Sequence, residues 1–537
     1  MYAPTPDGEV RILNHIRLDR DYNNTAYFAT QSAQESYFMS HGPSGLVFTD
    51  CMYIRQTRRL RVPVSADTLC GCNYLMYKNQ QYVNKWFYAF IDQVYYLNDN
   101  CAEIEFTIDV MQTYFPECLI PDCWIERNHI PKAADIVGAN RINESLDIGD
   151  YEIESTVRPS DLATDFSVVM FSTFDPADYS KSGGSLNDGM YSALKRTVIG
   201  RVQLTQTASG TTNATWVQDP RPIIEDIVQN HADLVDGVVA LILTPTYFES
   251  HSSKLFNVTR PIAYSGYTVK NNKLFTAPYL VLYVTSGSAV GKFYQFEEFI
   301  ASNGAIAQFV ILSDKAPAQS TILAPANYKC DLRGTGVSDL NYSEMMIDTG
   351  FPQCAWVSDA FKTYLAQNQT NIGVTAGMGA LQIVGGVITT VATEGAGAAL
   401  GAGMIMSGIG TIMGHVSDMQ DKSKRPPEAH GNITGTALYL AGEKTFRAYV
   451  MRPRTEYLKI IDDFWEKFGY PIKAIGTPNF NARSHWTYIK TADVAVNPFG
   501  AASGDADDIK KIADILNRGI TFWVHEYEIG DYSLSNT

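Results

Sequence analysis

The sequence is poor in charged residues. Only 18% of its 537 residues are Asp, Glu, Lys or Arg, whereas soluble proteins average about 25%. The 57 acidic side chains outnumber the 42 basic ones and give a net charge of −15. This shortage of Lys and Arg argues against broad, affinity-driven binding of nucleic acid, which needs an excess of basic side chains to contact the phosphates. Disorder is excluded for most of the chain, because 45% of the residues are hydrophobic.

Recognisable catalytic motifs are also missing. HExxH and GxSxG do not occur, and the nine histidines are scattered. Residues 287–293 resemble a phosphate-binding P-loop, but the loop is one residue short and its lysine is not followed by Ser or Thr. The stretch 19–23 begins like a calcium loop, but Asn24 and Thr30 replace the required Gly and Glu, so we expect a turn there. We therefore predict no enzymatic activity, no metal site and no cofactor.

The first residues, MYAPTPDGEVRILNH, contain neither a basic region nor an apolar stretch. We therefore expect no secretory signal and a reducing site of synthesis, where disulfides are rare. A zinc site at Cys70, Cys72, Cys118 and Cys123 would need paired CxxC spacings, which are absent. We expect free and mostly buried thiols at all eight cysteines: Cys51, Cys70, Cys72, Cys101, Cys118, Cys123, Cys330 and Cys354.

Aromatic residues and turn formers are abundant. The chain has 25 Phe, 31 Tyr and 7 Trp beside 40 Gly and 23 Pro, which is typical of β-rich proteins. Residues 104–110 alternate strictly, which places Ile104, Phe106 and Ile108 with Val110 on one buried strand face and Glu105 on the polar face. The run 85–91 is apolar on both faces and is predicted to be a central strand, joined to the next by a turn at 98–100.

The remaining chain predicts a mainly β protein with α+β parts, several domains, and tube domains of the β-barrel or β-sandwich type. Strand-like runs at 168–171, 239–243 and 279–284 lie between polar stretches without a fixed repeat. We expect an N-terminal β tube domain at 1–130 and a middle β-rich domain at 131–345. The segment 346–430 carries an unusual apolar stretch, and an α+β tube domain follows at 431–537.

The last part of the chain changes pattern. A strand from 446 to 451 precedes a helix whose apolar stripe is Tyr457, Ile460, Ile461, Phe464, Trp465 and Phe468. Strands at 472–475 and 486–489 follow. A second helix carries Ile509, Ile512, Ala513 and Leu516, with acidic residues at its start and Gly519 after its end. A strand at 520–524 completes a β-α-β-β-α-β order, which predicts a split βαβ module.

The segment 371–414 differs from everything around it. Its 44 residues contain 12 glycines, 7 alanines, no aromatic residue and one charge, Glu394. Glu394 separates two uncharged runs, 371–393 and 395–414, each long enough for a helix to cross a bilayer. GxxxG spacings, which favour helix packing in lipid, recur along it. The residues predicted to insert in membrane are Ile372, Gly373, Val374, Gly377, Met378, Leu381, Ile383, Val384, Val387, Ile388, Val391, Glu394, Gly397, Leu400, Gly401, Met404, Ile405, Met406, Ile409, Gly410, Ile412, Met413 and Gly414.

Three interpretations of this apolar hairpin remain open. It is a constitutive transmembrane hairpin, a buried core hairpin, or a loop that inserts into membrane only after release from the protein's own assembly. So many glycines would weaken a helix in water, and a core normally includes aromatic residues. Polar flanks at 367–371 and 418–428 separate the hairpin from its neighbours. These features favour the conditional loop.

Several stretches resemble a known family. The most specific is NKWFYAF at 84–90, and the others are 10–13, 21–25, 72–77, 108–113, 467–470, 478–479, 488–493, 517–523 and 529–532. Together they resemble the tail-knob, or distal tail tube, proteins of small short-tailed phages of Gram-positive hosts, of the picovirus or Salasmaviridae type. The likeness covers about the first 130 and last 100 residues and the apolar hairpin, while 131–345 cannot be aligned.

The resemblance implies a structural virion protein. Six copies would form a hollow tube at the tail tip, through which double-stranded DNA passes without specific binding. The apolar loops would plug the lumen and, on release, insert into the host cell membrane to form a pore. Implied partners are the upper and lower collar proteins, a tail-tip lytic protein and membrane lipid. A pore-forming toxin or bacteriocin is the alternative function, and a tail-tip peptidoglycan-degrading enzyme is a weaker one.

Four arginines, Arg55, Arg58, Arg59 and Arg61, are the local exception to the acidic composition. Arg55, Arg59 and Arg61 would share one strand face. They would line the lumen, contact the neighbouring tail component, or form intersubunit salt bridges with acidic strands. The net charge of −15 favours the salt bridges.

Overall fold

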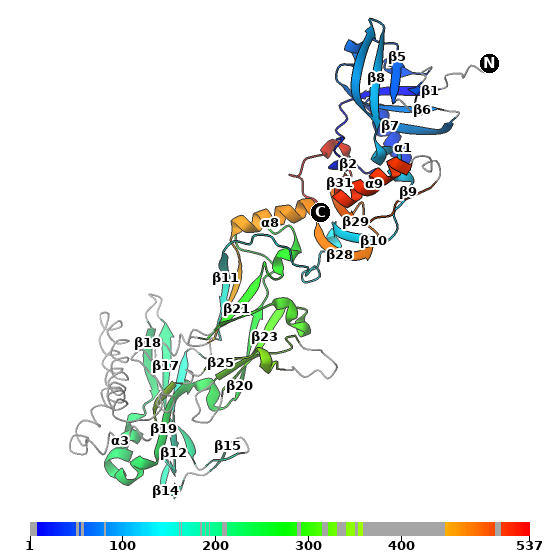
Figure 1. The fold of residues 1–537 in the computed structure, drawn as a ribbon. Helices are drawn as coiled ribbons and strands as arrows, with labels where there is room; N and C mark the ends of the chain where they lie inside the picture. The colour runs from blue at the N-terminus through cyan, green and yellow to red at the C-terminus, as the bar shows by residue number, and fades with distance from the viewer. Residues whose placement is uncertain are drawn as a thin grey trace, which may run out of the picture. The chain divides into compact units, whose positions relative to one another are not determined.

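The structure is a computed structural model of the chain (Figure 1). It describes residues 8–43, 45–49, 53–54, 58–79, 82–159, 162, 164–182, 185–187, 190–192, 194–206, 212–286, 291–313, 321–329, 340–348, 353–357, 446–499 and 506–537. The predicted membrane-inserting segment 371–414 and Arg55 therefore lie outside the described residues. The chain forms two compact units and crosses between them four times. Unit 1 contains Met1–Gly149, Thr268–Leu274 and Thr455–Thr537, and unit 2 contains Asp150–Tyr267 and Phe275–Arg454.

Both units consist mainly of β-sheets, which confirms the predicted fold class at this level. Among the described residues, no helix is both long and apolar enough to span a membrane. The described α-helices are α1 Gln31–Ser40, α2 Val110–Thr113, α3 Arg221–Asn230, α8 Thr455–Phe468 and α9 Ala506–Arg518.

A curled seven-stranded sheet occupies the N-terminal part of unit 1 (Figure 1). Its strands, in sheet order, are β3 Val47–Phe48, β1 Gly8–Asn14, β6 Cys72–Asn79, β7 Tyr82–Asn98, β8 Cys101–Ile108, β5 Arg59–Val62 and β4 Tyr53–Ile54. The long strand β7 pairs with β6 through its first half and with β8 through its second half. A bulge between Ile91 and Gln93 separates the halves, and bulges of this kind bend a sheet. The sheet therefore curls into half a barrel.

The two faces of this sheet match the sequence patterns. The run 85–91 is buried on both faces in the central strand β7, and β8 alternates with Ile104, Phe106 and Ile108 buried, as predicted. Val110 is buried too, but in α2 rather than in the strand. One face belongs to the main core of unit 1, and the other packs Tyr74, Tyr88 and Phe90 against Phe38 of α1. The β7–β8 turn at 98–100 is where the sequence predicts it.

A second sheet of unit 1 brings together strands from both ends of the chain. In sheet order they are β2 Asn24–Ala26, β31 Ile520–Trp523, β29 Trp486–Ala492, β10 Cys123–Asn128 and β28 Tyr470–Gly476. A separate two-stranded sheet is formed by β9 Cys118–Leu119, which precedes β10 along the chain, and β30 Asn497–Pro498, which follows β29. Helix α9 packs Ile512 and Leu516 into the same apolar core as Ile489 and Phe522, so one core joins both sheets.

The strands and helices of the predicted split βαβ module are present, but the strands do not pair as predicted. Its first strand, β27 Arg447–Pro453, pairs with β11 and β21 in unit 2. Strand β10, from the N-terminal part of the chain, lies between β28 and β29. The reason is that β10 itself has a buried face, with Cys123 and Ile125 in the main core. The module is therefore completed by the N-terminal part of the chain and does not form a closed fold of its own.

The buried face of α8 also differs from the predicted stripe. Leu458, Ile461 and Trp465 are buried, whereas Ile460 is 67% exposed. Residues three and four apart share a helix face, and Leu458 replaces Ile460 at the position that continues the Ile461–Trp465 face. The prediction was correct for Ile461 and Trp465 and wrong for Ile460. In α9 the stripe through Ile512 and Leu516 is confirmed, and Gly519 follows with φ of +103°.

The segment Thr268–Leu274, which we call the strap, returns the chain to unit 1 between two stretches of unit 2. The amide of Asn271, which is 1% exposed, donates to Asp462 Oδ1 at 2.8 Å. The backbone N–H of Asn272 donates to Asp135 Oδ2 at 3.0 Å. Both carboxylates are buried. The strap is thus held by buried polar contacts with α8 and with the N-terminal part of the chain.

Unit 2 contains two four-stranded sheets. The first is β11 Tyr151–Val157, β27, β21 Val281–Thr285 and β22 Gly291–Tyr294. The second is β20 Ser253–Thr259, β23 Ile306–Ser313, β24 Thr321–Pro325 and β25 Met346–Asp348. Their inner faces meet through Tyr294 and Phe309, whose ring centroids are 5.0 Å apart. The two sheets form a sandwich.

A third sheet completes unit 2. In order, its strands are β18 Thr212–Gln218, β17 Lys195–Gln206, β12 Asp165–Ser172, β19 Val238–Pro245 and β26 Gln353–Val357. Helix α3 packs Ile227 against its strands. Two small hairpins follow β12, formed by β13 Phe174–Asp175 with β14 Asp178–Ser182 and by β15 Ser185–Asn187 with β16 Met190–Ser192. The strands predicted at 168–171, 239–243 and 279–284 correspond to β12, β19 and β21.

Candidate functional site

The arginines that the sequence singled out are separated by the fold. Arg59 and Arg61 lie on β5 with side chains 48% and 72% exposed, and they alternate with buried Leu60 and Val62. Arg58 precedes them in a turn with φ of +53°, and its guanidinium lies 4.0 Å from Asp508 of α9. Arg59 and Arg61 therefore share one face, as predicted, while Arg58 does not.

Both exposed arginines have acidic partners on the neighbouring strand. Strands β5 and β8 are antiparallel, which places Arg59 opposite Glu105 and Arg61 opposite Glu103. Arg61 Nε lies 2.9 Å from Glu103 Oε2, and Arg59 lies 3.1 Å from Glu103 Oε1 and 3.3 Å from Glu105 Oε2. Tyr95 on β7 donates its hydroxyl to Glu105 at 2.9 Å. We call these five residues the charged strip.

The charged strip has no net charge. The two positive charges of its guanidinium groups are balanced by the two negative charges of its carboxylates. The hydrogen bond from Arg61 lowers the pKa of Glu103, so this carboxylate stays ionised and keeps compensating the arginines. Donation to Glu105 raises the pKa of Tyr95, which keeps the hydroxyl protonated as a donor. Exposed pairs of this kind add little to stability, so the arrangement mainly sets the charge of the surface.

A cavity of about 480 Å³ lies beside the curled sheet in unit 1. Its lining includes Lys85 of β7, whose ammonium is 2.8 Å from Glu117 Oε2 and 5.2 Å from the ring centre of Tyr114. The Lys85 side chain is 8% exposed. Sequence reasoning treated this lysine as part of an apolar run and missed the pair. A lysine inside an otherwise apolar central strand is itself the signal, because a buried ammonium needs a partner.

The side chains considered for metal binding have structural roles. The carboxylate of Asp21 accepts from the Asn23 backbone N–H at 3.1 Å, and the Tyr22 N–H donates to the Asp19 carbonyl, which makes the predicted turn. No group of three or more His, Cys, Asp or Glu in the described part of the chain is arranged to hold a metal ion.

The described cysteines are free thiols, but most are not buried. Cys70 is exposed, Cys72, Cys101 and Cys118 are partly exposed, and Cys123 is buried. The expectation of buried thiols was therefore wrong for four of these five cysteines and correct for Cys123. Cys70 and Cys72 flank Gly71, whose φ of +93° marks a tight turn before β6 at the surface.

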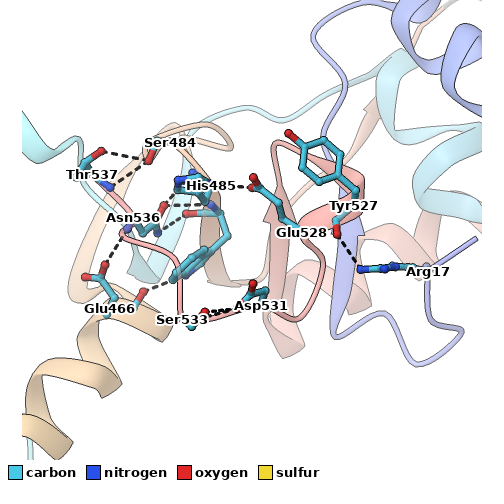
Figure 2. A network of polar contacts seen from close by, with 11 residues as sticks. Arg17, Glu466, Ser484, His485, Tyr527, Glu528, Asp531, Ser533, Asn536 and Thr537 are labelled. Carbon is cyan, nitrogen blue, oxygen red and sulfur yellow. Dashed lines mark hydrogen bonds and ion pairs between the residues drawn. The ribbon is translucent and has the colours of Figure 1, made fainter.

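A polar network fixes residues 527–537 against β29 (Figure 2). Asn536, which is 1% exposed, accepts from the N–H groups of His485 and Trp486 and donates to the Trp486 carbonyl at 2.8 Å. His485 Nδ1 lies 2.7 Å from Glu528, and the Arg17 guanidinium donates to the Tyr527 carbonyl at 2.7 Å (Figure 2). The network therefore ties the C-terminal residues to β29 and, through Arg17, to the loop between β1 and β2.

Comparison with known proteins identifies the family. The C-terminal domain of the tail knob protein gp9 of Bacillus phage phi29 matches residues 246–537, more than half of the chain. The N-terminal region of caudoviral major tail proteins matches residues 6–118, which hold the curled sheet. The tail knob proteins gp9 of Bacillus phages B103 and phi29 are each 24% identical to this chain, with 100% of it and 99% of each relative covered.

The fold agrees with a solved structure. The bacteriophage C1 tail knob protein gp12 superposes with a TM-score of 0.64 at 12% identity, with 98% of this chain and 99% of that chain covered. The resemblance expected from the sequence is thus confirmed, and it extends over 131–345, which the sequence alone did not align. These relatives are structural components of the phage tail and not enzymes. The chain belongs to the tail knob protein gp9 family of phi29-like phages.

Proposed function

We propose that six copies of this tail component form the distal tail tube, a hollow conduit for the phage genome. The full-length match to tail knob proteins carries this proposal. Assembly with other tail proteins follows from the family, and we propose the collar proteins and a tail-tip lytic protein as the specific partners. Negative-stain imaging of the purified chain tests the conduit, since hollow six-fold rings are expected. A chain that stays monomeric at every concentration would contradict it.

We further propose that the charged strip faces the lumen and presents a wall without net charge. A ring of six chains carries 6 × −15 = −90 formal charges, so the conduit as a whole does not attract DNA. Exposed arginines in the lumen would bind phosphates and retard passage. Glu103 and Glu105 compensate Arg59 and Arg61 within hydrogen-bond distance. Because of this compensation, arginines can lie in the wall of the lumen without giving it a ring of net positive charge.

Replacing both acidic partners of the arginines should reveal an affinity of the charged strip for DNA. Glu103→Gln with Glu105→Gln leaves the two guanidiniums uncompensated. We expect affinity for double-stranded DNA at low salt to rise at least about tenfold, with the steep salt dependence of phosphate contacts. Fluorescence anisotropy measures it. Asp507→Asn with Asp514→Asn, two exposed sites on α9, is the matched control with the same change in net charge. Equal binding by both double variants would contradict a specific role of the strip.

For the apolar segment we propose that the hairpins at 371–414 plug the lumen and enter the host membrane on release. The composition supports this, with two uncharged runs on either side of Glu394. Glycines at GxxxG spacing suit helix contacts in lipid better than a helix in water. Self-burial inside a ring would keep six such hairpins from water before release. The virion tail and then the host membrane are the locations that this function implies.

Membrane insertion should depend on the protonation of Glu394. A carboxylate in lipid is costly when ionised, so acid favours insertion. We expect the full chain to leak dye from liposomes more at pH 5 than at pH 7. Glu394→Gln should raise leakage at pH 7 and remove most of the pH dependence, and deletion of 371–414 should abolish leakage. Leakage by the wild-type chain that is equal at both pH values would contradict the role of Glu394.

A further inference from the structure

Within the part of unit 2 that the structure describes, both outer faces of the sandwich carry partly or largely exposed side chains. The inner faces contain Leu282, Val284 and Val450 on one sheet and Phe256, Ala307 and Phe309 on the other, and all six are buried. Side chains alternate along a strand, so the residues between these point outward on opposite sides of the sandwich. These two outer faces could join neighbouring copies of the chain in the proposed ring, on which this inference rests.

The outer face of the β11-β27-β21-β22 sheet carries an aromatic row. Tyr283 pairs in register with Phe293 on one side and Tyr449 on the other, with ring centroids 4.8 and 6.4 Å apart. Phe293 is 59% exposed. Next to this row lies an aliphatic one, in which Ile153, 56% exposed, is in register with Met451. We call this surface the ladder face: Ile153, Val281, Tyr283, Phe293, Tyr449 and Met451.

A glycine shapes the ladder face. Gly291 lies beside Tyr283, and a Cβ atom there would come within 1.9 Å of the Tyr283 hydroxyl. Any larger residue would displace this ring. Because Gly291 has no side chain, the Tyr283 ring can lie across the neighbouring strand. The rings then form a continuous row that stays close to the sheet.

The opposite outer face, on the β20-β23-β24-β25 sheet, is aliphatic. Leu312, Ile322 and Ile347 are in register across three strands, and Leu255 is in register with Val310. Leu255 is 51% exposed and Ile347 is 43% exposed. None of the members is charged. We call this surface the aliphatic face: Leu255, Ile306, Val310, Leu312, Ile322 and Ile347.

We propose that the ladder face of one copy binds the aliphatic face of the next copy in the ring. Two different apolar faces on opposite sides of one sandwich cannot both be covered by a two-fold pair, but a head-to-tail contact covers both. Charge also points to a second copy. Each chain carries −15, so copies repel one another, and contact costs least through uncharged side chains such as the members of the two faces.

The size of the faces explains why a ring would form rather than a pair. Four strands about 4.8 Å apart and six residues of about 3.3 Å each give a face of about 400 Å². One contact would then bury about 800 Å² in total, below the roughly 1,200 Å² of a stable interface. Ring closure gives every copy two such contacts, whereas a pair has one. Intermediates should therefore be scarce beside monomers and complete rings.

Single charges placed on either face test the contact in the full chain. Phe293→Asp and Leu255→Asp should each raise, at least about tenfold, the concentration at which half of the chains are in rings. Sedimentation velocity measures it. Ile262→Asp is the control, because Ile262 is 89% exposed and belongs to neither face. Ile153→Asp and Ile347→Asp form a second pair, which decides the matter if either first variant changes the circular dichroism spectrum.

Mixing the variants distinguishes head-to-tail from two-fold contacts. A Leu255→Asp chain keeps its ladder face and a Phe293→Asp chain keeps its aliphatic face. At high protein concentration, where a single weak contact is populated, the mixture should therefore form mixed dimers, and neither variant alone should. Dimers of one variant alone would overturn the proposal, since they require like faces to meet. Rings that form equally well with Asp on both faces would overturn it and leave the conduit standing. A wild-type chain without rings would overturn both.

Discussion

Replacing Lys273 by methionine is expected to lower the free energy of unfolding of unit 1 by about 3 kcal/mol. The side chain of this strap residue is 1% exposed, and its ammonium donates to the Ile142 carbonyl at 2.7 Å and to Glu144 at 2.9 Å. Removing one partner of a buried ion pair costs about 3–5 kcal/mol, because the other charge stays buried. Arg127 and Trp465 also bond Glu144, which places the loss at the lower end.

The strap contains its own control. Lys270 is paired with Asp463 at 2.7 Å, but both side chains are 46% exposed. Lys270→Met is expected to cost less than about 1 kcal/mol, as exposed pairs usually do. Urea unfolding followed by tryptophan fluorescence compares the two variants, and Trp465 lies 5.3 Å from the Lys273 ammonium. Equal losses at both lysines would contradict the view that burial decides the effect.

Asn536→Ala is expected to cost about 3 kcal/mol as well. Its carboxamide bonds three backbone groups at the start of β29: the N–H of His485 just before the strand, at 3.0 Å, and the N–H and carbonyl of Trp486, at 3.1 and 2.8 Å (Figure 2). Trp486, which contributes two of them, is fully buried. A buried backbone group that loses its partner costs about 1–3 kcal/mol. Alanine would remove the partner that these groups have in the wild-type chain.

Hydrogen exchange at the amides of His485 and Trp486 gives the direct measurement. Both should exchange faster in Asn536→Ala, in proportion to the lost stability. Ser533→Ala is the control, because Ser533 is exposed and bonds only the nearby Asp531 among the contacts drawn in Figure 2. It should change stability by no more than about 0.5 kcal/mol. Unchanged protection at Trp486 in the Asn536 variant would show that the network does not hold β29.

Local sequence patterns were reliable wherever the property is local. Alternation from Ile104 to Ile108 and the doubly apolar run 85–91 predicted strands and their buried faces correctly, because side-chain period depends only on neighbouring residues. The same holds for α9 and the glycine that follows it. The error in α8 has a non-local cause. Ile460 is apolar and lies next to the buried stripe, but the packing of the helix against the rest of the chain leaves it facing solvent.

Pairing between distant strands was not predictable from a single sequence. Nothing near Trp486 or Tyr470 indicates that β10 lies between their strands. The charged strip shows the same limit. The sequence placed Arg59 and Arg61 on one strand face and Glu105 on the polar face of another strand, but the register that brings them together depends on the pairing of β5 with β8. Buried Lys85 and Lys273 were missed because their acidic partners are 32 and more than 100 residues away.

Both units contain sheets that combine strands from distant parts of the sequence. Strand β10 pairs with β28 and β29, and β11 and β21 pair with β27, so each unit contains a sheet shared between residues before 358 and residues after 445. A single break of the backbone between 358 and 445 would therefore separate no folded unit from its partner strands. The two fragments would stay together through two independent sheets, as the halves of a split protein do.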